Sequence, residues 1–122
     1  MKTQGKDISN NSKRQWMYQL NKALSEHIAD ATLNNQRLAE IFELSERHLS
    51  RKVKEFTGLS PQRYLRQHRL KRAMNYLRYG KYKTVGETAR AIGYVNTSYF
   101  IQQFEKQFGK RPFTILKESG WR

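Results

Sequence analysis

Two short segments of the sequence combine guanidinium, amide and hydroxyl side chains at the spacing of one helix face. The first contains Arg47, Ser50 and Arg51, and the second is centred on Ser98 and Gln102. An arginine side chain can donate two parallel hydrogen bonds to a planar pair of acceptors, and a glutamine amide can donate one bond while it accepts another. These groups recognise the edges of planar polar molecules, and they need a rigid element to hold them in place.

The overall charge favours an anionic partner. Lysine and arginine number 24 against 10 acidic residues in a chain of 122, which gives a formal net charge of +14. Such a charge binds polyanions because counterions are released from them. Ribosomal and membrane-surface proteins share this property, so charge alone does not identify the partner.

Several function classes find no support in the composition. The chain has no cysteine, which excludes disulfides, cysteine zinc sites and thiol catalysis and fits the cytoplasm. No apolar stretch approaches the roughly 20 residues that cross a bilayer, so we expect no membrane contact from this segment. His27, His48 and His68 fall on three different predicted helices without an acidic cluster or nucleophile motif. We therefore expect no enzyme, no metal and no cofactor.

Apolar spacing and capping residues predict an all-α fold of about seven helices, because no segment shows the alternation of a strand. Residues 1–12 have no apolar period, and we expect a disordered lead-in or linker end before structure begins near Lys13. Residues 13–59 are predicted to form an N-terminal helix-turn-helix subdomain. A long linker helix at 60–79 and a C-terminal helix-turn-helix subdomain at 80–122 follow.

The two predicted subdomains repeat one pattern. The segment 38–65 aligns with 88–116 when one extra residue is placed in the second turn. A duplicated helix-turn-helix needs the same small, apolar, glycine and proline positions in each copy. The linker helix would span about 30 Å, close to the roughly 34 Å between successive major-groove segments of DNA. One chain is thus predicted to read two adjacent groove segments. The aligned pairs are Ala39 with Ala89, Leu49 with Phe100, Val53 with Phe104, Gly58 with Gly109, Pro61 with Pro112, and Leu65 with Leu116.

The start of the second helix in each subdomain is expected to face the bases, as in other recognition helices. Arg51 suits guanine O6 and N7, Gln102 suits adenine, and Ile101 suits a thymine methyl group. Because no arginine aligns with Arg51 in the second copy, we expect weaker or A·T-leaning readout there. The predicted base contacts are Arg47, Ser50, Arg51, Thr97, Ser98, Ile101 and Gln102, and the predicted phosphate contacts are Asn35, His48, Lys54, Lys83, Thr84, Asn96 and Tyr99.

The sequence resembles the AraC/XylS family of bacterial transcription regulators from about Lys13 to Leu116. The resemblance rests on 38–39 through 49–54, on 57–61 and on 69–73 in the first half. In the second half it rests on Ala89, 92–94, 98–100, 104–109 and Pro112.

The resemblance implies a sequence-specific regulator of transcription, most often an activator, that binds double-stranded DNA and contacts RNA polymerase. It also implies a sensor or dimerisation domain in a longer parent protein. The region of Trp16 together with 57–72 resembles the output end of hybrid two-component regulators. Two positions depart from the family pattern: Arg111 replaces a small hydroxyl residue, and Ile115 replaces an aromatic one.

Two other functions remain open from the residues alone. A nonspecific basic nucleic-acid binder that takes RNA would place aromatic rings on an exposed platform. A protein-interaction module would show a DNA affinity that hardly depends on salt. The aromatic residues favour packing over a platform, because they fall at core spacing in the predicted helices: Phe42, Phe56, Phe100, Phe104 and Phe108.

Overall fold

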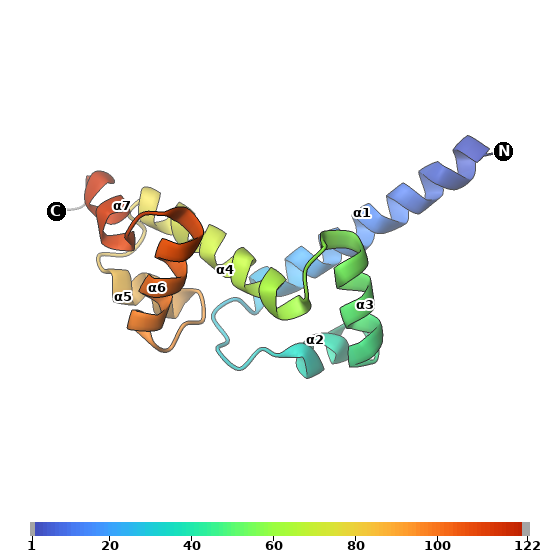
Figure 1. Ribbon diagram of the computed structural model, residues 1–122, viewed down its shortest axis with the longest axis horizontal. Helices are drawn as coiled ribbons and strands as arrows, with labels where there is room; N and C mark the ends of the chain where they lie inside the picture. The colour runs from blue at the N-terminus through green and yellow to red at the C-terminus, as the bar shows by residue number, and fades with distance from the viewer. Residues whose placement is uncertain (1, 121–122) are drawn as a thin grey trace.

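The computed structural model describes the backbone of residues 2–120 and the side chains of residues 11–120. Within this range the chain forms seven α-helices and no strand, which confirms the all-α prediction. Figure 1 shows that the helices before α4 gather near its N-terminal end and that those after it gather near its C-terminal end. The helices are α1 (Lys2–Glu26), α2 (Asn35–Ile41), α3 (Glu46–Thr57), α4 (Pro61–Arg78), α5 (Val85–Ala91), α6 (Thr97–Phe108) and α7 (Pro112–Glu118).

The apolar stripe from Trp16 to Ala31 predicts a first helix that begins near Lys13 and continues to about Ala31, and α1 differs from these bounds at both ends. It begins at Lys2, well before Lys13, because the polar segment before Lys13 contains no proline to interrupt a helix. It ends at Glu26 although the apolar stripe continues to Ala31, because Asp30 forms a local turn. The Oδ1 atom of Asp30 accepts hydrogen bonds from the backbone N–H (2.9 Å) and hydroxyl (2.6 Å) of Thr32. The role of residues 1–12 as a linker stays a prediction, and residues 1, 121 and 122 lie outside the described part.

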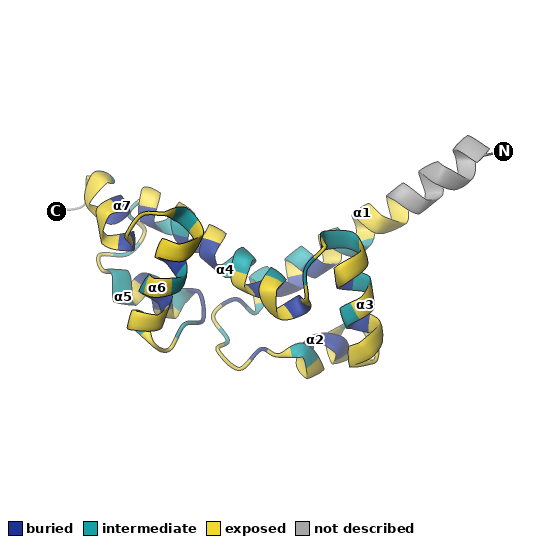
Figure 2. Ribbon diagram, in the orientation of Figure 1, coloured by how far each residue is buried: buried dark blue, intermediate teal, exposed yellow. Residues whose placement is uncertain are grey.

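Two hydrophobic cores lie along α4, and this helix contributes to both (Figure 2). Its N-terminal half places Leu65 in the first core, and its C-terminal half places Leu70, Ala73 and Leu77 in the second. The predicted packing role of the central aromatic residues is confirmed, since Phe100 and Phe104 are both 0% exposed. The first core otherwise contains Leu20, Leu24, Leu33, Leu38, Ala39, Leu49 and Val53, and the second contains Ile28, Ala89, Ile92, Phe100, Phe104, Ile115 and Leu116.

The helix caps recur in the two subdomains. Helices α2 and α5 have 7 residues each, and α3 and α6 have 12 each. Gly58 and Gly109 end α3 and α6 in the left-handed region, with φ of 78° and 72°, where a glycine avoids the cost of a Cβ atom. At each N-terminus a side-chain oxygen accepts a backbone N–H, and these caps are Asn34, Ser45, Thr84 and Asn96.

The turn inside each helix-turn-helix is also repeated. The N–H of Leu44 donates to the carbonyl of Ala39, and that of Tyr94 donates to Ala89, both at 2.9 Å. The residue before each donor has a positive φ, 56° at Glu43 and 88° at Gly93. The same turn is therefore built once with glutamate and once with glycine.

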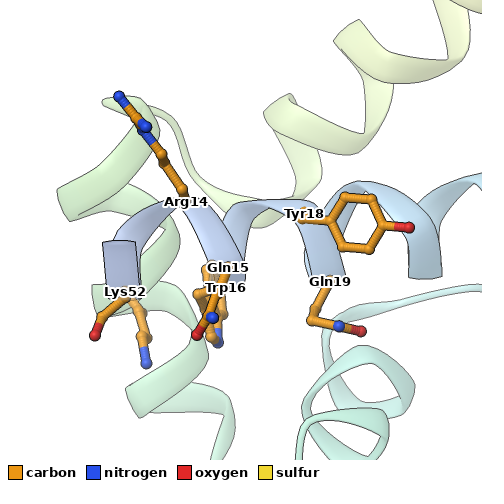
Figure 3. Close-up of a pocket in the computed structure, with 7 residues that line it drawn as sticks. Arg14, Gln15, Trp16, Tyr18, Gln19 and Lys52 are labelled. Carbon is orange, nitrogen blue, oxygen red and sulfur yellow. The ribbon is translucent and has the colours of Figure 1, made fainter. Parts of the chain in front are cut away.

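Helix α1 is fixed to the first subdomain by an aromatic cluster and to α4 by polar contacts. The ring of Trp16 lies 5.2 Å from Phe42 and 5.6 Å from Phe56, and the Lys52 ammonium lies 5.1 Å from the Trp16 ring (Figure 3). These contacts hold the middle of α1 against the C-terminal end of α2 and against α3.

The polar contacts between α1 and α4 centre on Ser25, whose Oγ lies 2.9 Å from Arg72 Nη2 and 3.2 Å from His68 Nε2. Burial, and then the charges of Arg72, Lys71 and Arg69, lower the pKa of His68 below its ordinary 6.5. Because a neutral imidazole can accept the Ser25 hydroxyl proton while Arg72 donates to the same oxygen, the three groups form a consistent network.

Candidate nucleic-acid interface

The two predicted recognition helices, α3 and α6, have their N-terminal ends at one edge of the molecule. Figure 1 shows both helices running upward from the lower side, α3 near the N-terminal end of α4 and α6 near its C-terminal end. The first turn of a helix carries unpaired backbone N–H groups and the positive end of the helix dipole, which favour anions. This shared edge is the candidate interface.

In the first subdomain, the predicted contacts Arg47, His48 and Arg51 are all exposed on α3, and Ser50 is half-buried. Two guanidinium groups one turn apart are thus available to a partner at this edge. Lys54 lies elsewhere, because its Nζ donates to the carbonyl of Gly58 (3.0 Å) at the opposite end of the helix. A phosphate contact from Lys54 would have to break this bond.

In the second subdomain, Ser98, Tyr99 and Gln102 are exposed on α6, whereas Thr97 is half-buried. Asn96 is the N-cap, and its Oδ1 accepts the N–H of Tyr99 at 2.9 Å, so its amide NH₂ group is the donor that it can offer to a partner.

The exposed apolar side chains of the second subdomain, which could contact thymine methyl groups, are not those predicted from the sequence. Ile101, predicted to contact a thymine methyl, is only partly exposed because it packs against the C-terminal core. Val95, which was not predicted, is 82% exposed in the turn directly before Asn96. A valine in a turn between polar residues was the sequence signal for this position.

The flanking phosphate candidates lie at the starts of the two short helices α2 and α5. Asn35 Oδ1 accepts the side-chain amide of Gln62 at 3.0 Å. Thr84 Oγ1 accepts the N–H of Glu87 at 3.0 Å, and the Glu87 carboxylate accepts the N–H of Lys83 at 3.1 Å. These acceptors stabilise the protein itself, so contact with an anion falls to the backbone N–H groups, the Asn35 amide and the Lys83 ammonium group.

The remaining surface features lie outside the shared edge. A hollow of about 680 Å³ is lined by α1 and α3, outside the shared edge (Figure 3). No group of three His, Asp or Glu side chains in the described part can hold a metal ion. None of the described helices is long and apolar enough to span a membrane. The hollow is lined by Ser12, Arg14, Gln15, Trp16, Tyr18, Gln19 and Lys52.

Known proteins with similar sequences contain the same helix-turn-helix arrangement in their family description. Residues 38–118 match the family described as "Helix-turn-helix domain". The HTH-type transcriptional activator RhaS of Escherichia fergusonii is 37% identical over 92 residues, which is 75% of this chain and 32% of that protein. The chain therefore spans about a third of the length of these curated relatives.

Two solved structures share the fold. The C-terminal domain of the two-component response regulator yesN from Fusobacterium nucleatum has a TM-score of 0.75 at 25% identity, covering 84% of this chain and 98% of that one. A transcriptional regulator from Chromobacterium violaceum, one of the AraC-type DNA-binding domain-containing proteins, has a TM-score of 0.78 at 20% identity, covering 92% and 96%. The second likeness concerns the fold alone.

Proposed function

Because the chain belongs to the AraC-type family of helix-turn-helix DNA-binding domains, we propose that it binds a two-part site on double-stranded DNA through α3 and α6 and regulates transcription there. The observation that carries the proposal is the shared edge, at which both recognition helices begin on the same side of the molecule (Figure 1). The 18 residues of α4 span about 27 Å, somewhat less than one turn of B-DNA at roughly 34 Å. Both helices can therefore address neighbouring segments of the major groove on one face of the duplex.

Arg51 is the principal proposed base contact. It is exposed on α3, and its two parallel donors fit the O6 and N7 acceptors of guanine. Arg47 lies one turn earlier and extends the same polar face. In the second subdomain Gln102 is exposed at the aligned position, where its amide fits adenine. We therefore expect a G·C-containing motif under α3 and an A·T-richer one under α6.

The remaining proposed contacts are consistent with this placement of α3 and α6 on their two motifs. Ser50, Thr97 and Ser98 add shorter polar contacts to bases, and Val95 joins Ile101 as an apolar candidate for thymine methyl groups. Phosphates on either side are held by exposed side chains and by the starts of the helices. The proposed phosphate contacts are Asn35, His48, Lys83, Thr84, Asn96 and Tyr99, with Lys54 only if it leaves Gly58.

Selection from a random duplex library tests the proposal. We expect the wild-type protein to enrich two short motifs about one helical turn apart, and Arg51→Ala to lose information in one motif only. Arg78→Ala is the matched control, because it removes the same charge from an exposed position in the last turn of α4, and it should keep both motifs. Binding without any enriched motif would show a nonspecific polyanion binder and overturn the assignment.

The salt dependence separates the remaining alternatives. A protein that contacts six phosphates loses roughly a thousandfold in affinity between 50 and 200 mM salt. A DNA affinity that changes little with salt concentration would favour a protein-interaction module. Equal affinities for duplex DNA and for duplex RNA of matched sequence would favour a general nucleic-acid binder.

We further propose that this segment works in the cytoplasm as part of a longer protein with a sensor or dimerisation domain, and that it activates transcription through contact with RNA polymerase. The likenesses to RhaS and to the yesN response regulator support these assignments. Reporter expression from a promoter that carries the selected site measures whether the bound protein activates or represses.

A further inference from the structure

Arg69, in the middle of α4, joins segments from both subdomains. Its Nη2 atom donates to the backbone carbonyl of Asp30 at 2.7 Å, in the loop that connects α1 to α2. Its Nε is buried without a hydrogen-bond partner in the described part of the chain. A half-buried arginine that donates to a backbone carbonyl, and whose buried Nε has no partner, is engaged inside the protein, which points to a structural task.

The same guanidinium lies against the turn of the second helix-turn-helix. A Cβ atom built on Gly93 would be 2.9 Å from Arg69 Cζ and 2.5 Å from the carbonyl oxygen of Ile28. The Ile28–Asp30 loop, the middle of α4 and the Gly93 turn therefore meet in one contact. The side chain of Ile28 continues this contact, since it is 7% exposed and belongs to the C-terminal core.

These contacts give the two subdomains a second connection besides α4. A single helix can bend or twist between two bodies, whereas two separate connections restrict their relative rotation. The loop after α1 supplies the second connection, and the hydrogen bond from Arg69 to the Asp30 carbonyl holds this loop against α4.

We infer that Arg69 is a positioning residue that sets the spacing and relative orientation of α3 and α6, and hence the number of base pairs between the two motifs. This inference rests on the proposed function, because spacing has meaning only for a two-part site. Arg69 specifies the distance between the motifs without reading a base itself.

A spacing series tests the inference on the intact chain. Affinities are measured for the selected site and for sites with one or two base pairs inserted or removed between the motifs. We expect Arg69→Met to reduce the preference for the native spacing by about tenfold, the factor that one hydrogen bond from a charged donor is worth, and Arg69→Lys to retain part of it. Arg78→Met, the matched control on the same helix, should keep the wild-type profile.

The outcomes separate the two proposals. If the wild-type protein selects no two-part site, the proposed function fails. If it selects one and Arg69→Met weakens all spacings equally, or none, the positioning role is refuted while the proposed function stands.

A second measurement needs no DNA. The chain has no cysteine, so spin labels can be attached through Glu55→Cys on α3 and Lys106→Cys on α6, two exposed positions. We expect a narrow distribution of label distances in the wild type and a broader one with Arg69→Met, and circular dichroism confirms that the variant is folded. An unchanged distribution would refute the inference.

Discussion

Replacement of Gly93 by alanine tests how closely the two subdomains are packed. The residue has a φ of 88°, and a left-handed conformation costs an L-residue about 1–2 kcal/mol. The new Cβ would also lie 2.5 Å from the backbone oxygen of Ile28, and such overpacking costs about 1–3 kcal/mol. We therefore expect Gly93→Ala to lower the free energy of unfolding by about 2–5 kcal/mol, a large share of the total for a small domain.

The chain contains its own controls for the conformational part of this cost. Gly58 and Gly109 have nearly the same φ, 78° and 72°, but a Cβ atom at either position would meet nothing within 4 Å. Gly58→Ala and Gly109→Ala should each cost only this conformational part, about 1–2 kcal/mol. The excess at Gly93 then measures the steric contact alone.

Urea unfolding followed by far-UV circular dichroism measures all three variants. The slope of unfolding free energy against urea concentration should be the same in all variants, so that differences between their urea midpoints report differences in stability. Gly93→Ala should lower the free energy of unfolding by the same amount in the Arg69→Met background as in the wild type, because the contact with the rigid backbone of Ile28 remains. If Gly93→Ala costs no more than Gly109→Ala, the loop after α1 does not pack on this turn as described.

Further predictions concern caps and pH. Arg111 begins α7 without the side-chain cap that Ser60 gives α4, so Arg111→Ser should raise the unfolding free energy by about 1 kcal/mol, measured by urea titration. Glu43→Gly should stabilise the protein by up to about 1 kcal/mol in the same assay, because it relieves a positive φ. Hydrogen bonds from Thr32 and the ion pair with Arg37 lower the pKa of Asp30 from 3.8 to about 2, so its stabilisation is present above pH 3.8 and lost toward pH 2; thermal melts of Asp30→Asn should show a weaker acid dependence. The pKa of His68 is lowered below 6.5 by burial, so its neutral form stabilises the fold at higher pH and stability falls as pH drops below 6.5; His68→Gln should flatten that decline in thermal melts.

Features encoded within a few residues were predictable from the sequence. Ser60 and Pro61 start α4, and Gly58 and Gly109 end α3 and α6, as expected, because a cap depends on the residues beside it. The exposed face of Arg47 and Arg51 followed from the apolar spacing of the same helix. The identity of the DNA-contacting residues stays a prediction.

Features that depend on distant contacts were not predictable. The contact of Arg69 with Asp30 joins residues 39 positions apart, and in sequence Arg69 is one basic residue among several on its helix. Ile101 had the spacing of an exposed recognition residue, yet its side chain packs partly on the C-terminal core. The end of α1 was misplaced because the Asp30 turn competes with an apolar stripe that continues beyond it.

The position of α4 in both cores has a consequence for amide hydrogen exchange. Leu65 is buried in one core and Leu70, Ala73 and Leu77 in the other, so local opening of either subdomain leaves half of the helix packed. Amides near the middle of α4 can exchange only when both cores open together, whereas those of α2 or α7 can exchange through the opening of one. The middle of α4 should therefore be the slowest-exchanging segment, with a protection that reports the global stability of the chain.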